Sequence, residues 1–166
     1  MLVTIMTDAS VCPNYLVGGF GYWIASNRGK EGGGKPFNTT TPDSFNGELK
    51  AVVCSLHIAI KRGFVIAGDE VLIQLDNMSV VNLLNKEYAQ NPKRQDIIEL
   101  YAAVEDMVKT YNLTLRSRWV KGHSSRKENR FKSNVCCDDR AKQGLKEARK
   151  IHRRQNTTQP TKKETK

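Results

Sequence analysis

The chain has 166 residues, with 27 Lys and Arg against 17 Asp and Glu and a formal net charge of +10 at pH 7. This length allows one domain with a substantial core and a short tail. No apolar run approaches the roughly 20 residues of a membrane span, and the N-terminus lacks the basic start of a secretory signal. We therefore expect neither an integral membrane protein nor a secreted one.

The four cysteines, Cys12, Cys54, Cys136 and Cys137, show no C-x-x-C spacing. This argues against a zinc site and against a disulfide framework. It predicts reduced thiols in a cytoplasmic protein, or one in the host cytoplasm if the source is viral. The predicted helices leave no spare apolar face, so we expect a monomer.

The positive charge is concentrated near the end of the chain. Residues 1–115 hold 10 Lys and Arg against 12 Asp and Glu, whereas residues 116–166 hold 17 against 5. A charge run is often only a solvated helix face or a solubility tail. An excess this concentrated favours a polyanion such as nucleic acid. Membrane binding is disfavoured because the basic stretch lacks the large apolar face of an interfacial helix.

Apolar periodicity predicts five strands and four helices. In chain order they are strands at residues 2–6, 20–25 and 34–39, a helix at 48–62, a strand at 71–75, helices at 80–84 and 97–111, a strand at 113–120 and a helix at 135–154. Residues 121–134 are expected to form a polar, basic loop and residues 155–166 a disordered basic tail. This order predicts an α/β fold with a mixed sheet, an opening meander being followed by strands reached through helices.

Acidic residues stand at four notable points of this pattern. Asp8 and Asp76 each follow a buried strand, and such strands bring their ends to one edge of the sheet, where ligands bind. Glu48 and Asp138 stand in the first turn of predicted helices. Each acid has an ordinary explanation, as a turn residue or as a partner of the helix dipole. Four gathered carboxylates, however, would repel one another unless cations lay between them.

Five short motifs, taken in order, resemble those of type 1 ribonuclease H. They are Thr7-Asp8-Ala9-Ser10, Asn46-Gly47-Glu48-Leu49, Gln74-Leu75-Asp76-Asn77, Trp119-Val120-Lys121-Gly122-His123 and Cys137-Asp138-Asp139-Arg140-Ala141. The glycine-rich pattern of the first motif is met by Asp8, Ser10, Asn14, Gly18, Gly19 and Gly21. The resemblance covers residues 2–145 and implies a ribonuclease H-like mixed five-stranded sheet, with an antiparallel three-strand meander and parallel strands, flanked by helices. Residues 1–154 would form the domain.

The resemblance implies hydrolysis of the RNA strand of RNA/DNA hybrids, as in primer removal during DNA replication, leaving 5′-phosphate and 3′-hydroxyl ends. The implied metal ligands and catalytic carboxylates are Asp8, Glu48, Asp76 and Asp138. They would hold two Mg²⁺ ions, for which Mn²⁺ could substitute. The choice of Asp138 over its neighbour Asp139 depends on the motif alignment. His123, which could also be an ordinary exposed loop histidine, is implied to assist catalysis without binding metal.

Contacts to the RNA strand are expected from short polar side chains near the carboxylates. The candidates are Ser10, Asn14, Asn46, Asn77 and Asn134, each of which could equally be a turn or cap residue. Residues 85–93 are too few for the basic protrusion with which some family members hold the hybrid. We hypothesise that the loop before the last helix, with that basic helix, replaces it, the loop residues being Arg126, Lys127, Arg130 and Lys132.

Two alternatives remain open. The same fold and metals could act on DNA junctions or other DNA structures, as relatives of this fold do. The chain could also be a non-catalytic module that binds nucleic acid. The V-K-G-H motif and the glycine-rich loop argue against the first alternative, and the presence of all four carboxylates argues against the second.

Overall fold

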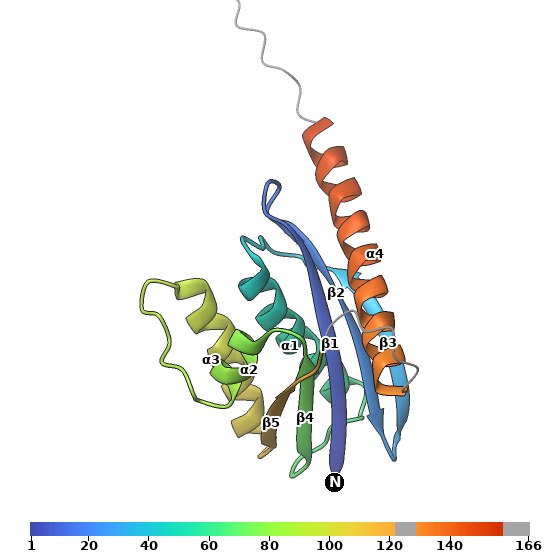
Figure 1. Ribbon diagram of the computed structural model, residues 1–166, viewed down its shortest axis with the longest axis vertical. Helices are drawn as coiled ribbons and strands as arrows, with labels where there is room; N and C mark the ends of the chain where they lie inside the picture. The colour runs from blue at the N-terminus through green and yellow to red at the C-terminus, as the bar shows by residue number, and fades with distance from the viewer. Residues whose placement is uncertain (122–128, 158–166) are drawn as a thin grey trace, which may run out of the picture.

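The computed structural model describes the backbone of residues 1–121 and 129–157 and the side chains of residues 1–121 and 136–157. Five strands form one sheet in the order β3-β2-β1-β4-β5 (Figure 1). The strands are β1 (Leu2–Cys12), β2 (Val17–Ser26), β3 (Gly29–Pro36), β4 (Glu70–Leu75) and β5 (Thr114–Trp119). The helices are α1 (Ser44–Lys61), α2 (Met78–Leu84), α3 (Gln95–Thr110) and α4 (Asn129–Thr157).

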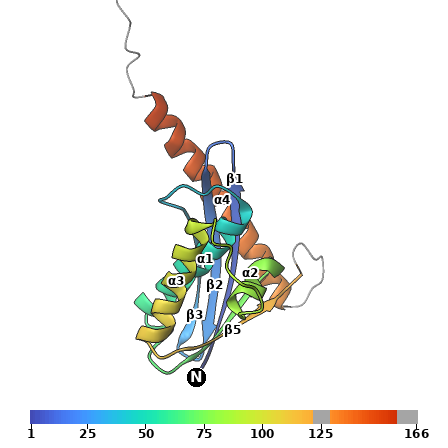
Figure 2. The same cartoon turned by 90° about the vertical axis from the view of Figure 1, so that its left-hand side faces the viewer.

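The sheet is mixed, as predicted. Strands β1, β2 and β3 form an antiparallel meander, while β4 pairs in parallel with both β1 and β5. Helices α1, α2 and α3 cover one face of the sheet and α4 covers the other, as Figures 1 and 2 show from two sides. Within the described residues, no helix combines the length and the apolar character needed to cross a bilayer.

The main core lies between the sheet and α1. Ile5 on β1 and Ile73 on β4 are fully buried, and they are neighbours across the parallel pair. Helix α1 adds the fully buried side chains of Leu49, Val52 and Leu56, whose spacing places them on one face of the helix. This packing fixes α1 against the centre of the sheet.

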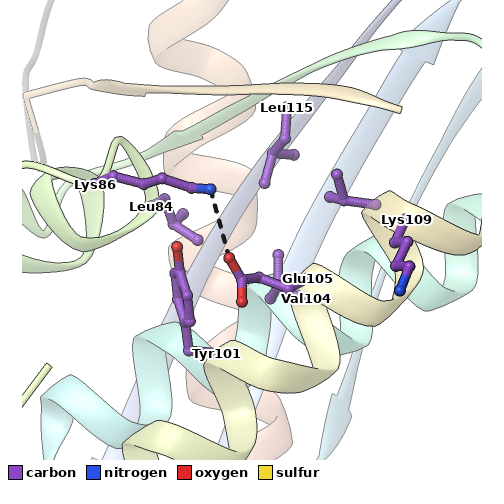
Figure 3. A pocket seen from close by; sticks show the side chains of 8 residues that line it. Leu84, Lys86, Tyr101, Val104, Glu105, Lys109 and Leu115 are labelled. Carbon is purple, nitrogen blue, oxygen red and sulfur yellow. Dashed lines mark ion pairs between the residues drawn. The ribbon is translucent and has the colours of Figure 1, made fainter. Parts of the chain in front are cut away.

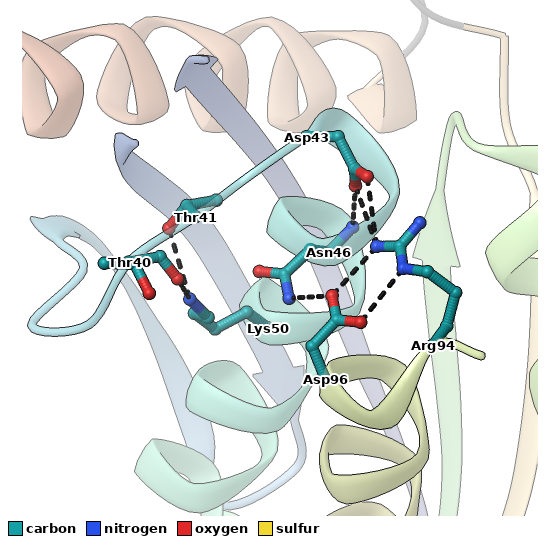
Figure 4. A network of polar contacts seen from close by, with 7 residues as sticks. All are labelled: Thr40, Thr41, Asp43, Asn46, Lys50, Arg94 and Asp96. Atoms are coloured by element: carbon teal, nitrogen blue, oxygen red, sulfur yellow. Dashed lines mark hydrogen bonds and ion pairs between the residues drawn. The ribbon is translucent and has the colours of Figure 1, made fainter. Parts of the chain in front are cut away.

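A polar network ties the start of α1 to the start of α3 (Figure 4). Asp43 caps α1 by accepting a hydrogen bond from the backbone N–H of Asn46 (2.9 Å). Arg94, at the start of α3, forms ion pairs with Asp43 (3.0 Å) and Asp96 (2.8 Å). These bonds hold the pKa of Asp96 well below its usual value, first through the hydrogen bond from Arg94. The turn that delivers Glu48 is therefore fixed from two helices.

All four helices begin earlier than the periodicity predicts, α1 and α4 by the largest margins. Helix α1 starts at Ser44 and α4 at Asn129, so the second half of the predicted basic loop is helical. Helix α4 also continues to Thr157, past the predicted end at residue 154. As a result, neither Glu48 nor Asp138 lies in the first turn of its helix. The helix dipole, which acts within the first turn, therefore does not explain either acid.

Three strands also differ from their predicted limits by more than one residue, and one of them is β2, which begins at Val17 rather than at residue 20. Strand β1 does not end at residue 6 but runs to Cys12, because its small residues continue to pair with β2. Strand β3 covers Gly29–Pro36 rather than residues 34–39, since a tight turn joins it directly to β2.

Helix α4 packs directly on the backbone of β2 and β3. A Cβ atom added to Gly19 would clash with the backbone of Gly144, and one added to Gly21 would clash with the carbonyl of Cys137. A Cβ atom on Gly34 would clash with Arg140. We call Gly19, Gly21, Gly34 and Gly144 the glycine seam. Glycines that resemble loop signals in the sequence are here sites of close backbone approach.

Candidate active site

Asp8 lies in the middle of β1, at the point where the neighbouring strand β4 stops. The pairing of β1 with β4 ends at Met6 and Gln74, while its pairing with β2 continues through Asp8 and Gly21. The Asp8 side chain is 8% exposed, and its Oδ1 accepts a hydrogen bond from the backbone N–H of Ala9 (2.9 Å). The sequence predicted an acid at a strand end. The acid is instead held by a continuous strand, which fixes its backbone more firmly.

Asp76 follows the last residue of β4 and is held through its backbone. The indole Nε1 of Trp119 donates a hydrogen bond to the Asp76 carbonyl (3.0 Å). The next residue, Asn77, caps α2 by accepting from the backbone N–H of Val80 (3.1 Å). Since β1 and β4 are in register, Asp76 reaches the same edge as Asp8.

Glu48 enters from α1 and is almost fully buried, with 6% of its surface exposed. Its Oε1 accepts a hydrogen bond from the Ala9 N–H (3.3 Å), the same donor that Asp8 uses. Its Oε2 is buried and has no hydrogen-bond partner among the described residues. A buried carboxylate oxygen without a partner is costly, so this atom indicates an absent ligand.

Asp8, Glu48 and Asp76 each place a carboxylate oxygen within 4.8 Å of the others, and we call them the carboxylate cluster. Burial raises the pKa of Asp8 to about 6, with further contributions from the charges of Asp76 and Asp138. Burial and the charge of Asp8 raise the pKa of Glu48 well above its usual value. Carboxylate oxygens are the ligands that hard divalent cations prefer, and such a cation would relieve both the repulsion and the orphaned oxygen. The residues therefore fit a divalent metal.

Asp138 approaches the cluster from α4, on the other face of the sheet. The buried thiol of Cys137 donates to the Met6 carbonyl (3.5 Å), which sets this turn of α4 beside β1. The charge of Asp138 acts on Asp8, whereas Asp139 is exposed. The Asp138 carboxylate forms an ion pair with Lys142 one turn further along α4 (2.7 Å). The structure thus brings oxygens of three acids within 4.8 Å of one another, with Asp138 close enough for its charge to act on Asp8.

The RNase H family model matches residues 2–146 of this chain. The chain belongs to the ribonuclease H family. It is therefore a nuclease, a hydrolase of phosphodiester bonds, and its fold is of the type 1 ribonuclease H kind.

Three relatives show how far this similarity extends. The chain is 28% identical over 151 residues to a ribonuclease H of Actinobacillus succinogenes, which covers 86% of this chain and 88% of that protein. The crystal structure of RNase H1 from the archaeon Halobacterium salinarum matches with a TM-score of 0.67 and 17% identity, over 89% of this chain and all of that one. LC11-RNase H1, isolated from compost by a metagenomic approach and crystallised with an RNA/DNA hybrid, matches with a TM-score of 0.65 and 15% identity, over 88% and 98%.

The predicted substrate contacts of this ribonuclease H lie in different environments. Ser10 is half-buried on β1 two residues after Asp8, and Asn14 is exposed in the β1–β2 turn. Asn77 is a helix cap. Asn46 is only 3% exposed and its amide donates to Asp96 (2.9 Å), so burial argues against its predicted contact with RNA.

Several predicted residues lie outside the described part of the chain. His123, Arg126 and Lys127 fall in residues 122–128, which the structure does not describe. Arg130, Lys132 and Asn134 belong to the backbone of α4, but their side chains lie outside the described residues. Their proposed roles stay predictions.

Sequence reasoning missed two contacts near the site. Lys142 could have been found, because an acid and a lysine four residues apart on a helix commonly pair. The contact of Arg94 with Asp43 could not, since the two residues are 51 positions apart and stand at the starts of different helices.

A separate pocket of about 420 Å³ lies between α2, α3 and β5 (Figure 3). Its walls are mainly apolar, from Leu84, Val104, Leu115 and their neighbours. An ion pair between Lys86 and Glu105 (3.6 Å) crosses it. None of the carboxylate cluster lines this pocket, which is therefore separate from the candidate active site.

Proposed function

We propose that this ribonuclease H is an endonuclease that hydrolyses the RNA strand of RNA/DNA hybrids by two-metal-ion catalysis, leaving 5′-phosphate and 3′-hydroxyl ends. The observation that carries the proposal is the carboxylate cluster, in which the buried Oε2 of Glu48 has no hydrogen-bond partner among the described residues. The hybrid in the LC11-RNase H1 structure supports the choice of substrate.

Asp8, Glu48 and Asp76 would hold the metals, with Asp138 completing the set. When bound, two Mg²⁺ or Mn²⁺ ions would activate the attacking water and stabilise the leaving 3′ oxygen. The chain's own part is rigid positioning. Asp8 is fixed by β1 and by the N–H of Ala9, which also orients Glu48. His123 would assist proton transfer or product release.

Selection of RNA requires contacts to 2′-hydroxyl groups near the scissile phosphate. Among the predicted contacts, Ser10 has the position that best suits this role. It lies on the same face of β1 as Asp8, because side chains two residues apart on a strand point to the same side. Asn14 is the next candidate, since it is exposed in the turn at the end of that strand.

The proposal is tested by incubating the protein with Mg²⁺ and end-labelled RNA/DNA, RNA/RNA, DNA/DNA and four-way junction duplexes. We expect cleavage of the RNA in the hybrid alone, with 5′-phosphate on the downstream product. An Asp8→Asn variant should lose at least about 10³-fold in cleavage rate, because the ligand set loses a charge. An Asp106→Asn variant, which changes an exposed acid of α3, is the matched control.

Cleavage of junctions without cleavage of hybrids would overturn the substrate assignment. Binding of hybrid without cleavage by the wild-type protein in Mg²⁺ and in Mn²⁺ would overturn the catalytic assignment. Equal activity of wild type and Asp8→Asn would overturn the role of the carboxylate cluster.

A further inference from the structure

A row of basic side chains follows Asp138 along α4. Lys142, Lys146, Arg149 and Arg153 are all exposed and are spaced three or four residues apart. Side chains at these spacings lie on one side of a helix. The ion pair between Lys142 and Asp138 (2.7 Å) shows the alignment directly. We call these four cations the α4 stripe.

The two flanks of α4 face different strands. On one flank, Arg140 donates to the carbonyl of Tyr22 (3.3 Å) and lies over the ring of Trp23 (6.0 Å), next to β3. On the other flank, a hydrogen bond with Arg149 lowers the pKa of the Cys12 thiol at the end of β1. The α4 stripe therefore lies on the flank that faces β1 and the carboxylate cluster.

The part of β1 beside the stripe is open toward β4. Pairing with β4 ends at Met6, whereas pairing with β2 continues to Cys12. Alternation along the strand places Asp8, Ser10 and Cys12 on one face. Their cross-strand partners Gly21 and Gly19 lie against α4, so this is the face toward α4. Figure 1 shows α4 and the β1–β2 hairpin extending together beyond the end of β4, with the last turns of α4 reaching past the hairpin.

We infer that the α4 stripe binds the phosphate backbone of the substrate duplex on one side of the scissile phosphate. This inference rests on the proposed function, because the carboxylate cluster sets where the duplex is cut. The residues from Arg140 to Thr157 include seven Lys and Arg and one acid, Glu147. Such a local excess of positive charge suits a polyanion, and it begins at the catalytic end of the helix.

The dimensions agree with a nucleic-acid backbone. Arg153 lies 15 residues after Asp138, which corresponds to about 22 Å along the helix. A duplex strand carries one phosphate per roughly 3.4 Å of its axis, so the stripe spans about six nucleotides beyond the cut. Basic side chains that contact phosphates contribute affinity without sequence preference, as an enzyme that cuts hybrids of any sequence requires.

The test measures binding of a labelled 18-base-pair RNA/DNA hybrid by fluorescence anisotropy between 50 and 300 mM KCl. All variants carry Asp8→Asn, which prevents cleavage. The stripe variant is Lys146→Gln/Arg149→Gln/Arg153→Gln, and it leaves out Lys142 because that residue contacts Asp138. The matched control is Lys30→Gln/Lys61→Gln/Lys109→Gln, which removes the same charge from exposed residues near the opposite end of the sheet.

We expect the stripe variant to bind about 10- to 100-fold more weakly at 0.1 M salt. The slope of log Kd against log salt concentration should fall by about 2 to 3, one for each lost phosphate contact. The control should change Kd less than about threefold. An equal loss in both variants, or no loss in the stripe variant, would overturn the inference.

Duplex length gives an independent readout. Hybrids are shortened from either end relative to a fixed cleavage position, which the wild-type protein defines. As the duplex on the side of the stripe is shortened below about six base pairs, the difference between the stripe variant and its parent should shrink, and below about three base pairs, short of Lys146, the two should bind alike. An affinity difference between the two proteins that persists at every duplex length would overturn the assignment of these phosphate contacts to the α4 stripe.

The two proposals can fail separately. If the wild type cleaves hybrids but the stripe variant binds normally, the stripe assignment fails and the nuclease assignment stands. If no hybrid is cleaved, the same salt titration with a DNA/DNA duplex still measures whether the stripe contacts phosphates.

Discussion

Strand β4 has an aspartate next to each end, Asp69 buried and Asp76 half-buried, and the two are held in opposite ways. Asp69, just before β4, accepts two hydrogen bonds from the Arg28 guanidinium and one from the backbone N–H of Ile66 (3.0 Å). Asp76, just after β4, belongs to a cluster of like charges with Asp8 and Glu48. We call the first arrangement the Asp69 clamp.

The pKa values show the difference. Hydrogen bonds from Arg28 hold the pKa of Asp69 well below its usual value, whereas burial raises the pKa of Asp8 to about 6. An acid whose pKa is lowered in the folded state stabilises that state above about pH 4. An acid whose pKa is raised to about 6 destabilises the folded state increasingly between about pH 4 and pH 6, and fully above it. The clamp therefore stabilises the fold, while the carboxylate cluster costs stability that a bound cation would restore.

The largest effect on stability is expected from breaking the clamp. Asp69→Asn should lower the free energy of unfolding at pH 7 by about 2–4 kcal/mol, because Arg28 loses its charged partner in a mostly buried setting. Urea denaturation measures this. Glu70→Gln is the control, since its ion pair with Arg116 is exposed and should contribute less than about 1 kcal/mol. An equal loss of unfolding free energy in Asp69→Asn and Glu70→Gln would contradict the stabilising role of the Asp69 clamp.

Neutralising one acid of the carboxylate cluster should instead increase the free energy of unfolding. In the presence of a chelator at pH 8, Asp8→Asn should raise the free energy of unfolding by up to about 3 kcal/mol, the equivalent of a pKa raised to about 6. Near pH 3 the gain should vanish, because Asp8 is then protonated in both the folded and the unfolded wild type. Denaturation curves at both pH values test this, with Asp106→Asn as the control. A destabilised Asp8→Asn protein at pH 8 would refute it.

The response to added metal should distinguish the Asp69 clamp from the carboxylate cluster. At a Mg²⁺ concentration ten times its Kd, binding should stabilise the wild type by about 1.4 kcal/mol, seen as a higher melting temperature. The Asp69→Asn protein should keep this response and the Asp8→Asn protein should lose it. Retention of the full shift by Asp8→Asn would place the metal elsewhere.

The smallest effect is expected from Lys142, which forms an ion pair with Asp138 beside the carboxylate cluster. Lys142→Gln should lower the Mg²⁺ concentration for half-maximal thermal shift by about two- to fivefold, since the exposed pair with Asp138 is worth about 0.2–1 kcal/mol. Lys146→Gln, one turn further from Asp138, is the control. A higher Mg²⁺ requirement in Lys142→Gln would show that the lysine positions Asp138 for the metal.

The sequence predicted the mixed sheet and the meeting of Asp8, Glu48 and Asp76, because apolar periodicity and acids after buried strands are local signals. It did not predict that Asp8 lies inside a strand. Gly18 and Gly19 resembled loop residues, and only the tertiary contacts explain why a strand contains them, Gly19 lying against α4 and Gly18 against Phe37. The burial of Asn46 was hidden for a similar reason, since its partner Asp96 is 50 residues away in the chain.

The glycine seam has a consequence for how this protein can vary. Along the seam α4 contacts the sheet through backbone atoms, so no side chain there can repack to absorb a substitution. Gly144 is six residues, about 9 Å, from Asp138 on the same rigid helix, so a displacement at the seam is carried to the acid. The outward side of α4 has no such constraint. One helix thus combines an inner side that has no room for a larger side chain with an outer side on which, beyond Lys142, charge can be gained or lost without moving the backbone that carries Asp138.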